Sequence, residues 1–488
     1  PDASSEPGTP DEPAKDTLVV ALSADALSMD PARHTTYPTG TVLFHIYDPL
    51  VTRDANGNIQ PWLAESWELL DDVTWQFKLK EGVTFTNGEP FNAECVKYSL
   101  ERVLDPDTQA PNKTRIAAID HVDVVDEYTV NVVTQYPAPT LLQGMAEDGF
   151  CAMMVPVQHT STSLETLGSE PVGTGPYMLK EWVKDDHITL VANDAYWGTA
   201  PAIKTIIFRP IPETSTAISE LKSGGVDVIT NVPPEQMDGL NTDTTKVVAK
   251  ATDRLFYINV NTLEEGPLQN KLVRQAIAYA IDVDAINESL LGGMAQRTAI
   301  NLPLEAFGYD ASLTPYEYNP EKAKELLAEA GYADGITIPF LSRNGRYIKD
   351  KEIVETCAAY LEQVGIHCEV ELVEGGVWQN RSENHGRKGI FYPGWSGRDA
   401  DLVFYPQLAS GQSQSYVSDE ALDAMIMEAR TTMDEAKRLA LYYEIDAYLY
   451  DQMYQIPLFQ SPAIYGVNNA LNWEPRNDDI LSFRDASF

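Results

Sequence analysis

One segment of the chain combines residue types that bind small molecules in many proteins. Residues 391–404 read FYPGWSGRDADLVF, in which Trp395 stands between glycines and is followed by Arg398, Asp399 and Asp401. Glycine lets the backbone approach a solute closely, and an indole offers apolar area at a small entropic cost. A guanidinium suits a carboxylate or phosphate, whereas a carboxylate accepts an amine. Core packing of the indole and a surface ion pair between the arginine and a neighbouring aspartate are the competing interpretations.

Motifs that would indicate an enzyme are weak or missing. GTGPY at 173–177 resembles a phosphate-binding loop, but Pro176 and the extended residues after it leave no helix start, so it predicts a turn. GWSGR resembles a nucleophile elbow except that Arg398 occupies the place of the second glycine. No H-E-x-x-H occurs, and the seven histidines have no ligand-like spacing. We therefore expect a protein without catalysis, cofactor or bound metal, and a peptide or cell-wall hydrolase is the enzymatic alternative.

Charge and composition narrow the class of protein. The 488 residues include 73 acidic and 35 basic ones, a formal net charge of -38. Such a charge repels nucleic acid and anionic lipid, so neither is expected as a partner, and solubility is its ordinary explanation. The 43% apolar and 22% charged residues are typical of a globular protein, and the length favours two or three domains. No apolar run reaches the ~18 residues of a membrane-crossing helix.

The first sixteen residues, PDASSEPGTPDEPAKD, have the composition of a tether. They contain proline, serine and acidic residues but no large apolar side chain, so they cannot offset the entropy of ordering. We expect a disordered tether over 1–16 in a processed secreted protein, running to a membrane or lipid anchor outside this sequence.

Four cysteines, Cys95, Cys151, Cys357 and Cys368, lack the spacing of a zinc site. Helical spacing around Cys357 and alternation around Cys368 direct both sulfurs to one helix–strand interface. They form either a disulfide or two buried thiols, and an exported chain favours the disulfide. Cys95 and Cys151 are the other possible disulfide.

Periodicity predicts antiparallel β-structure early in the chain and α/β structure later. We expect strands at 17–23 and 73–85, a helix at 91–104 capped by Asn92, and a hairpin at 123–134. A strand–helix–strand unit begins at residue 203. Further helices are expected over 269–286, 319–332 and around Cys357, with two more between residues 418 and 453.

Several stretches together resemble the extracellular solute-binding proteins of ABC importers, in the peptide and nickel group called family 5 or cluster C. They cover most of the chain, from Leu18 to Asn468, and their joint order is highly specific. They are YDPLVTRDANGNIQPWLAESWELLDDVTWQFKLKEGVTFTNGEPFNAECVKYSLERV, PVGTGPYMLKEW with YWG, FYINVNT with LVRQAIAYAID, and NPEKAKELLAEAGY.

The resemblance implies an α/β, bilobal fold of the periplasmic-binding-protein type II-like class with an additional β-rich domain. Domain I would comprise residues 17–45, 165–253 and 463–488, domain II residues 46–164, and domain III residues 254–462. FYINVNT and IPLFQSPAIYGV would be the two crossings between lobes.

The resemblance also implies that the tryptophan loop, with Trp395, Arg398 and Asp399, faces the ligand cleft. Dipeptide-binding members have an acidic residue three positions after the tryptophan, whereas this chain has Arg398. Together with Arg346, in a loop that can border the cleft, this favours a ligand with an anionic group, and Asp399 could accept an amine. Tyr37 resembles a cleft position of the nickel-binding members. A solvated Arg346 and an ordinary loop tyrosine are the alternatives.

The function implied is capture of a small solute, most simply a short peptide or peptide-like anionic compound, and its delivery to a membrane permease. Closure of the lobes on the ligand needs no covalent step. A monomer outside the cytoplasmic membrane or in the periplasm is expected, touching the membrane only through its tether. A nickel-chelate, heme, opine or sugar-conjugate carrier of the same family is the alternative.

Overall fold

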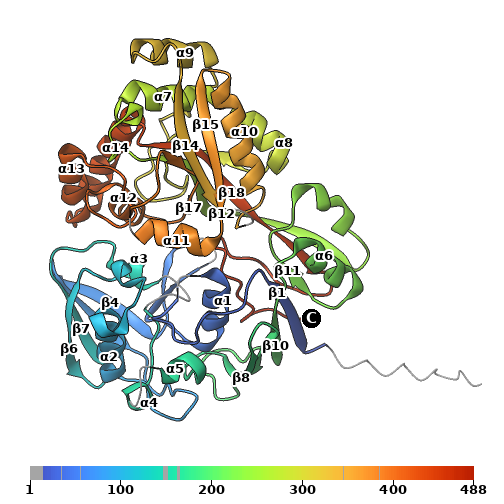
Figure 1. Cartoon of the computed structure of the whole chain (residues 1–488). Coiled ribbons are helices and arrows are strands. Elements are labelled where there is room, and N and C mark those ends of the chain that lie inside the picture. The colour runs from blue at the N-terminus through green and yellow to red at the C-terminus, as the bar shows by residue number, and fades with distance from the viewer. Residues whose placement is uncertain are drawn as a thin grey trace, which may run out of the picture.

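The protein is a bilobal α/β molecule (Figure 1). The computed structural model describes residues 15–34, 36–54, 57–146, 152–161, 165–343, 346–383 and 385–488. Residues 15–244 and the segment after 468 form the part called lobe 1 below, and residues 261–454 form lobe 2. This architecture confirms the expected fold class.

Two long strands connect the lobes. β12 (Thr245–Val260) and β18 (Gln455–Asn468) pair antiparallel along nearly their whole length, so each runs from one lobe into the other. The register shifts between Ala251 and Leu255, where such an irregularity bends the strand and increases its twist. Of the two segments expected to be crossings, FYINVNT begins in β12 and ends just after it, and IPLFQSPAIYGV lies within β18.

β12 and β18 are the central pair of a twelve-stranded sheet. On the lobe 2 side, the neighbours are β16 (Ile390–Phe391), β14 (Ile336–Arg343) and β15 (Ile366–Val373), with β17 (Gly394–Trp395) on β12 and β13 (Gln296–Arg297) on β18. On the lobe 1 side, they are β11 (Val228–Ile229), β1 (Thr17–Leu22), β10 (Thr205–Pro210), β9 (His187–Ala192) and β8 (Tyr177–Val183). The predicted strand–helix–strand unit is β10, α6 (Thr214–Ser223) and β11.

A separate antiparallel sheet in lobe 1 has the order β4 (Ala64–Asp71), β5 (Thr74–Leu79), β7 (Thr129–Thr134) and β6 (Ile119–Asp126). The alternation predicted for β5 is observed, because Trp75, Phe77 and Leu79 are buried in the core that this sheet shares with α2 (Ala93–Leu104). Helix α2 begins at the predicted cap, where Asn92 accepts two backbone N–H groups. The hairpin β2 (Val51–Arg53) and β3 (Ile59–Pro61) precedes this sheet.

The remaining helices include the predicted ones, one of them divided, and several that the sequence patterns did not indicate. Lobe 1 contains α1 (Tyr37–Ile46), α3 (Leu141–Met145), α4 (Val157–Ser161) and α5 (Thr166–Ser169). Lobe 2 contains α7 (Lys271–Ala280), α8 (Val283–Leu291), α9 (Pro320–Glu329), α10 (Asp350–Glu362), α11 (Gly375–Glu383), α12 (Ala400–Leu408), α13 (Glu420–Arg430) and α14 (Glu435–Gln452). The helices that the sequence patterns did not indicate are α1, α3, α4, α5, α11 and α12. The single helix expected over 269–286 is divided, because Ile281 is extended and Asp282 caps α8 through the Ala285 N–H. Within the described ranges, no helix has the length and apolar character needed to cross a bilayer.

The expectation of a disulfide between Cys357 and Cys368 was wrong. Cys357 on α10 and Cys368 on β15 both pack in the apolar core of lobe 2, as predicted, but both are free thiols. Burial raises the pKa of both, that of Cys368 to about 12, so each behaves as a small apolar side chain. Cys95 is likewise a free buried thiol, and Cys151 lies outside the described residues.

The expected tether lies mostly beyond the described residues, which begin at Lys15. Lys15 pairs with the buried Asp227 at 2.6 Å. The domain boundaries at residues 45, 164, 253 and 462 stay a prediction.

The helical part of lobe 2 buries an unpaired carboxyl group. Asp446 on α14 is fully buried; its Oδ2 accepts the Asp310 N–H at 2.9 Å, while its Oδ1 has no hydrogen-bond partner. Burial, with a smaller contribution from the charge of Asp310, raises the Asp446 pKa from 3.8 to about 8. Asp446 therefore remains protonated in the folded protein at neutral pH.

Asp446→Asn is expected to stabilise the protein increasingly as pH rises from about 4 toward 8. The unfolded chain releases the Asp446 proton at the lower pH and the folded protein holds it, so wild-type stability falls with pH across this window. Urea unfolding at several pH values should give a gain of more than ~1 kcal/mol at pH 8 and little gain at pH 4. The exposed Glu444→Gln on the same helix is the control; a pH-independent effect of Asp446→Asn would contradict the prediction.

Candidate functional site

A pocket with about 880 Å³ of empty space, part of it open to solvent, lies where the strands β12 and β18 pass between the lobes. Lobe 1 contributes Tyr37 and Asp479, the hinge strand β12 contributes Arg254, and lobe 2 contributes Arg346 and Tyr347. Both lobes therefore form its wall. Of the residues predicted for the site, Tyr37 and Arg346 line this pocket, and Trp395, Arg398 and Asp399 do not.

Guanidinium groups surround Tyr347. Arg343 donates to its hydroxyl at 2.9 Å, and the guanidiniums of Arg343, Arg346 and Arg254 lie 4.8, 5.2 and 5.8 Å from its ring centre. Burial alone would raise the Tyr347 pKa, but these three charges outweigh it and hold the pKa at about 7. This wall of the pocket is strongly electropositive.

Only one of the two pocket arginines is neutralised by a carboxylate. Arg254 donates from Nε to Asp479 at 2.7 Å and lies 4.5 Å from the Tyr37 ring centre. In the described part of the chain, Arg346 makes no ion pair. Its loop is fixed by the buried Asp350, which accepts the backbone N–H groups of Arg346 and Tyr347. A held loop therefore presents an unneutralised guanidinium to the pocket.

The two residues on either side of Trp395, Gly394 and Ser396, contact residues that line the pocket. A Cβ at Gly394 would lie 2.8 Å from the Tyr347 hydroxyl, so glycine permits this close approach. The Ser396 hydroxyl lies 3.1 Å from the hydroxyl of Tyr37, a contact between lobes. Trp395 itself is half-buried against the core of α12–α14 and donates from Nε1 to the Leu402 carbonyl at 3.2 Å.

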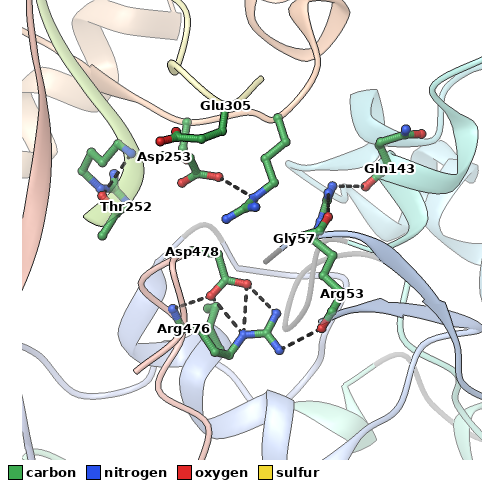
Figure 2. Close-up of polar contacts among 12 residues, drawn as sticks. Arg53, Gly57, Gln143, Thr252, Asp253, Glu305, Arg476 and Asp478 are labelled. Atoms are coloured by element: carbon green, nitrogen blue, oxygen red, sulfur yellow. Dashed lines mark hydrogen bonds and ion pairs between the residues drawn. The ribbon is translucent and has the colours of Figure 1, made fainter. Parts of the chain in front are cut away.

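Arg398 spans the boundary between lobes rather than pairing with a neighbouring aspartate. Its Nε donates to Asp253 at 3.2 Å, and a Cβ at Gly57 would overlap its guanidinium. Figure 2 shows that Asp253, Asp478 and Gly57 come together in this region from different segments. The Arg398 side chain of lobe 2 therefore pairs with the connecting strand β12 and lies against Gly57 of lobe 1.

Asp399 is buried and bonded to its own lobe. It is fully buried, caps α12 by accepting the Asp401 N–H, and forms two hydrogen bonds of 2.8 and 3.0 Å with Arg438. Burial raises its pKa to about 6 against the opposing charge of Arg438. Its oxygens are thus committed to Arg438 and the helix cap, and its position gives no support to the expected contact with a ligand amine.

Further contacts join the lobes. Asp401 of lobe 2 accepts a hydrogen bond from Thr140 of lobe 1 at 3.0 Å, and Lys349 of lobe 2 pairs with Glu235 of lobe 1 at 2.6 Å. The two lobes are therefore in direct contact next to the pocket.

Sequence reasoning missed Arg254, Tyr347 and Asp479. Arg254 stands just before the apolar crossing FYINVNT, and a charged residue next to a segment expected to pass between the lobes could have indicated a pocket residue. No sequence signal indicated Asp479, because it is 225 residues from Arg254, its partner at the pocket. Within the described ranges, His, Cys, Asp and Glu side chains nowhere form a group of three or more that could hold a metal ion.

Tyr347 is expected to ionise near pH 7. Ultraviolet difference spectra should show one tyrosinate appearing around neutral pH, well before the other buried tyrosines, and Tyr347→Phe should abolish this transition. Tyr37→Phe is the control, since burial raises the Tyr37 pKa. An unchanged transition in Tyr347→Phe would refute the assignment.

Asp399→Ala is expected to lower the free energy of unfolding by about 3 to 5 kcal/mol, because it leaves the Arg438 guanidinium buried without its partner. Urea denaturation measures this loss, and Asp434→Ala, at the exposed cap of α14, should cost only ~1 kcal/mol. A loss for Asp399→Ala no larger than that of the control would show that the ion pair is not structural.

Comparison with known proteins agrees with this architecture. The chain is 30% identical to the glutathione-binding protein GsiB of Pectobacterium atrosepticum over 444 residues, covering 88% of this chain and 85% of that protein. It is 29% identical to GsiB of Shigella flexneri serotype 5b, covering 97% and 94%. Among solved structures, it resembles the periplasmic binding protein DppA of Helicobacter pylori in complex with the peptide STSA, with a TM-score of 0.86, 25% identity and coverage of 97% and 98%.

The same fold occurs in AgaA from A. tumefaciens R10 in complex with agropinic acid, with a TM-score of 0.84, 25% identity and coverage of 96% of both chains. The profile of the bacterial extracellular solute-binding proteins, family 5, matches residues 58–416. The chain therefore belongs to this family and is a solute-binding component of an ABC importer rather than an enzyme.

Proposed function

We propose that the pocket between the lobes captures a short peptide or peptide-like solute through an anionic group. The observation that carries this proposal is Arg346, a pocket guanidinium without an ion pair in the described part of the chain. A guanidinium binds a carboxylate through two parallel hydrogen bonds, and this pairing is stronger away from bulk water. Tyr37, on the opposite lobe, would contact the same solute.

The names of the relatives support this class of ligand. Glutathione, named for GsiB, is a peptide with two carboxylates and one amine, and the DppA complex contains a peptide. Agropinic acid in AgaA is also acidic. These proteins share the fold and the solute-binding role, and the electropositive wall around Tyr347 suits such solutes.

Capture would work by stabilising the closed form. A solute that contacts both Tyr37 and Arg346 binds the closed form better than the open form, and it shifts the equilibrium by that difference in affinity. Trp395 and Arg398 would act in closure, the first by supporting the loop that carries Ser396 and the second by its contact with Asp253 and Gly57. Asp399 would hold this segment in place through its bonds to Arg438 and to the start of α12.

The importer component acts outside the cytoplasm, where family members bind solute and deliver it to permease subunits. We also propose that it acts as a monomer and that residues 1–16, by their composition, tether it to a lipid anchor.

Arg346→Met is expected to weaken glutathione binding at least tenfold, which is ~1.4 kcal/mol, because it removes the charge and keeps the apolar stem. Titration calorimetry measures the change, and Lys351→Met, an exposed cation nearby on α10, is the control. Equal affinities in wild type and Arg346→Met would refute the assigned contact.

A further inference from the structure

Two arginines in lobe 2, Arg387 and Arg343, differ from other arginines of the protein that also have a buried Nε. Six described arginines have an Nε that is buried without a hydrogen-bond partner: Arg102, Arg297, Arg343, Arg387, Arg430 and Arg484. Four of them direct their other nitrogens to carboxylates, in the pairs Arg102–Asp30, Arg297–Asp284, Arg430–Asp401 and Arg484–Asp48. Within the described ranges, Arg343 and Arg387 alone among these six make no ion pair.

Arg387 is the more buried of the two, with 4% of its surface exposed. Its guanidinium lies 4.3 Å from the ring centre of Trp378 on α11 and 5.1 Å from that of Phe391. Its polar contact is a long one of 3.4 Å from Nη1 to the Gln414 side-chain oxygen. Burial lowers its pKa to about 10, and Arg343 is among the charges that lower it further.

Arg343, at the end of β14, is half-buried and lies 4.7 Å from the same Trp378 ring centre. It donates to the hydroxyl of Tyr347, which lines the pocket between the lobes. The two arginines thus share one indole, and the more exposed one is connected to the pocket wall. Helix α11 lies at the level where the lobes meet (Figure 1).

A buried cation without a counter-ion is costly, by several kcal/mol in typical proteins. This chain has 73 acidic residues and pairs the other four of these arginines with carboxylates, yet Arg387 has no carboxylate partner within the described ranges. Two guanidiniums that lie 4.7 and 4.3 Å from the ring centre of one indole concentrate positive charge and N–H donors, which suit an oxyanion.

We propose that Arg343 and Arg387, held by Trp378, form an oxyanion subsite that takes a second acidic group of the captured solute. The proposal rests on the proposed function, because the first acidic group would lie at Arg346. Arg343 makes the accessible contact next to Tyr347, and Arg387 adds charge and donors from the interior. The preferred cargo is then a peptide-like compound with two acidic groups.

The test compares wild type, Arg387→Met and the control Arg381→Met, whose arginine lies on α11 with Trp378 but is paired with Glu371. Titration calorimetry measures the affinities of the peptides Ala-Glu-Ala and Ala-Gln-Ala, which have the same shape and differ by one acidic group. Wild type and the control should bind the acidic peptide about tenfold more tightly than the neutral one, as expected for a desolvated carboxylate–arginine contact. Arg387→Met should bind both peptides with the affinity that wild type has for the neutral one.

Equal binding of the two peptides by wild type, or discrimination retained in Arg387→Met, would overturn the subsite as a cargo contact. Failure of all three proteins to bind either peptide would refute the proposed function instead. In that case, the oxyanion site is tested by itself, by measuring the melting temperature of each of the three proteins in inorganic phosphate and in chloride. A phosphate-dependent rise in wild type and the control that is absent from Arg387→Met supports it, and equal rises in all three exclude it.

Discussion

The antiparallel pairing of β12 with β18 is the constraint on which the rest of the structure depends. Pairing of these strands joins the two lobes into one sheet, and the pairing is interrupted between Ala251 and Leu255, where the chain passes from one lobe to the other. Arg254 sits within this interruption, and its side chain reaches the pocket. The same two strands therefore connect the lobes and supply part of the pocket wall.

Charge is distributed unevenly in this acidic protein. Most buried arginines with incomplete hydrogen bonding have a carboxylate partner, whereas the groups around Tyr347 and Trp378 form an electropositive region without enough carboxylates to balance it. Tyr347 is the internal group that responds, through a pKa of about 7. An unbalanced region of this kind attracts anions and repels cations, which is the basis of the proposed anionic cargo.

Residues of the tryptophan segment make contacts within and between the lobes, although Trp395, Arg398 and Asp399 do not line the pocket. Ser396 contacts Tyr37 across the boundary, Arg398 contacts Asp253, and Asp399 fixes α12 through Arg438. The free thiols of lobe 2 show a related point, because helix and strand spacing placed Cys357 and Cys368 in one core correctly and still did not decide whether they bond.

Local pattern indicated strands of the lobe 1 sheet and helices such as α2, α7 and α9, since periodicity and capping depend on neighbours within a few residues. The family and the bilobal fold were implied by the resemblance of longer stretches. The same resemblance indicated Tyr37 and Arg346. The tertiary structure alone decided that Arg398 pairs with Asp253, that Asp399 is buried beneath Arg438, and that Arg343 and Arg387 share Trp378 without a carboxylate. Ion pairing depends on distances between segments far apart in the chain, and spacing along the sequence carries no information about those distances.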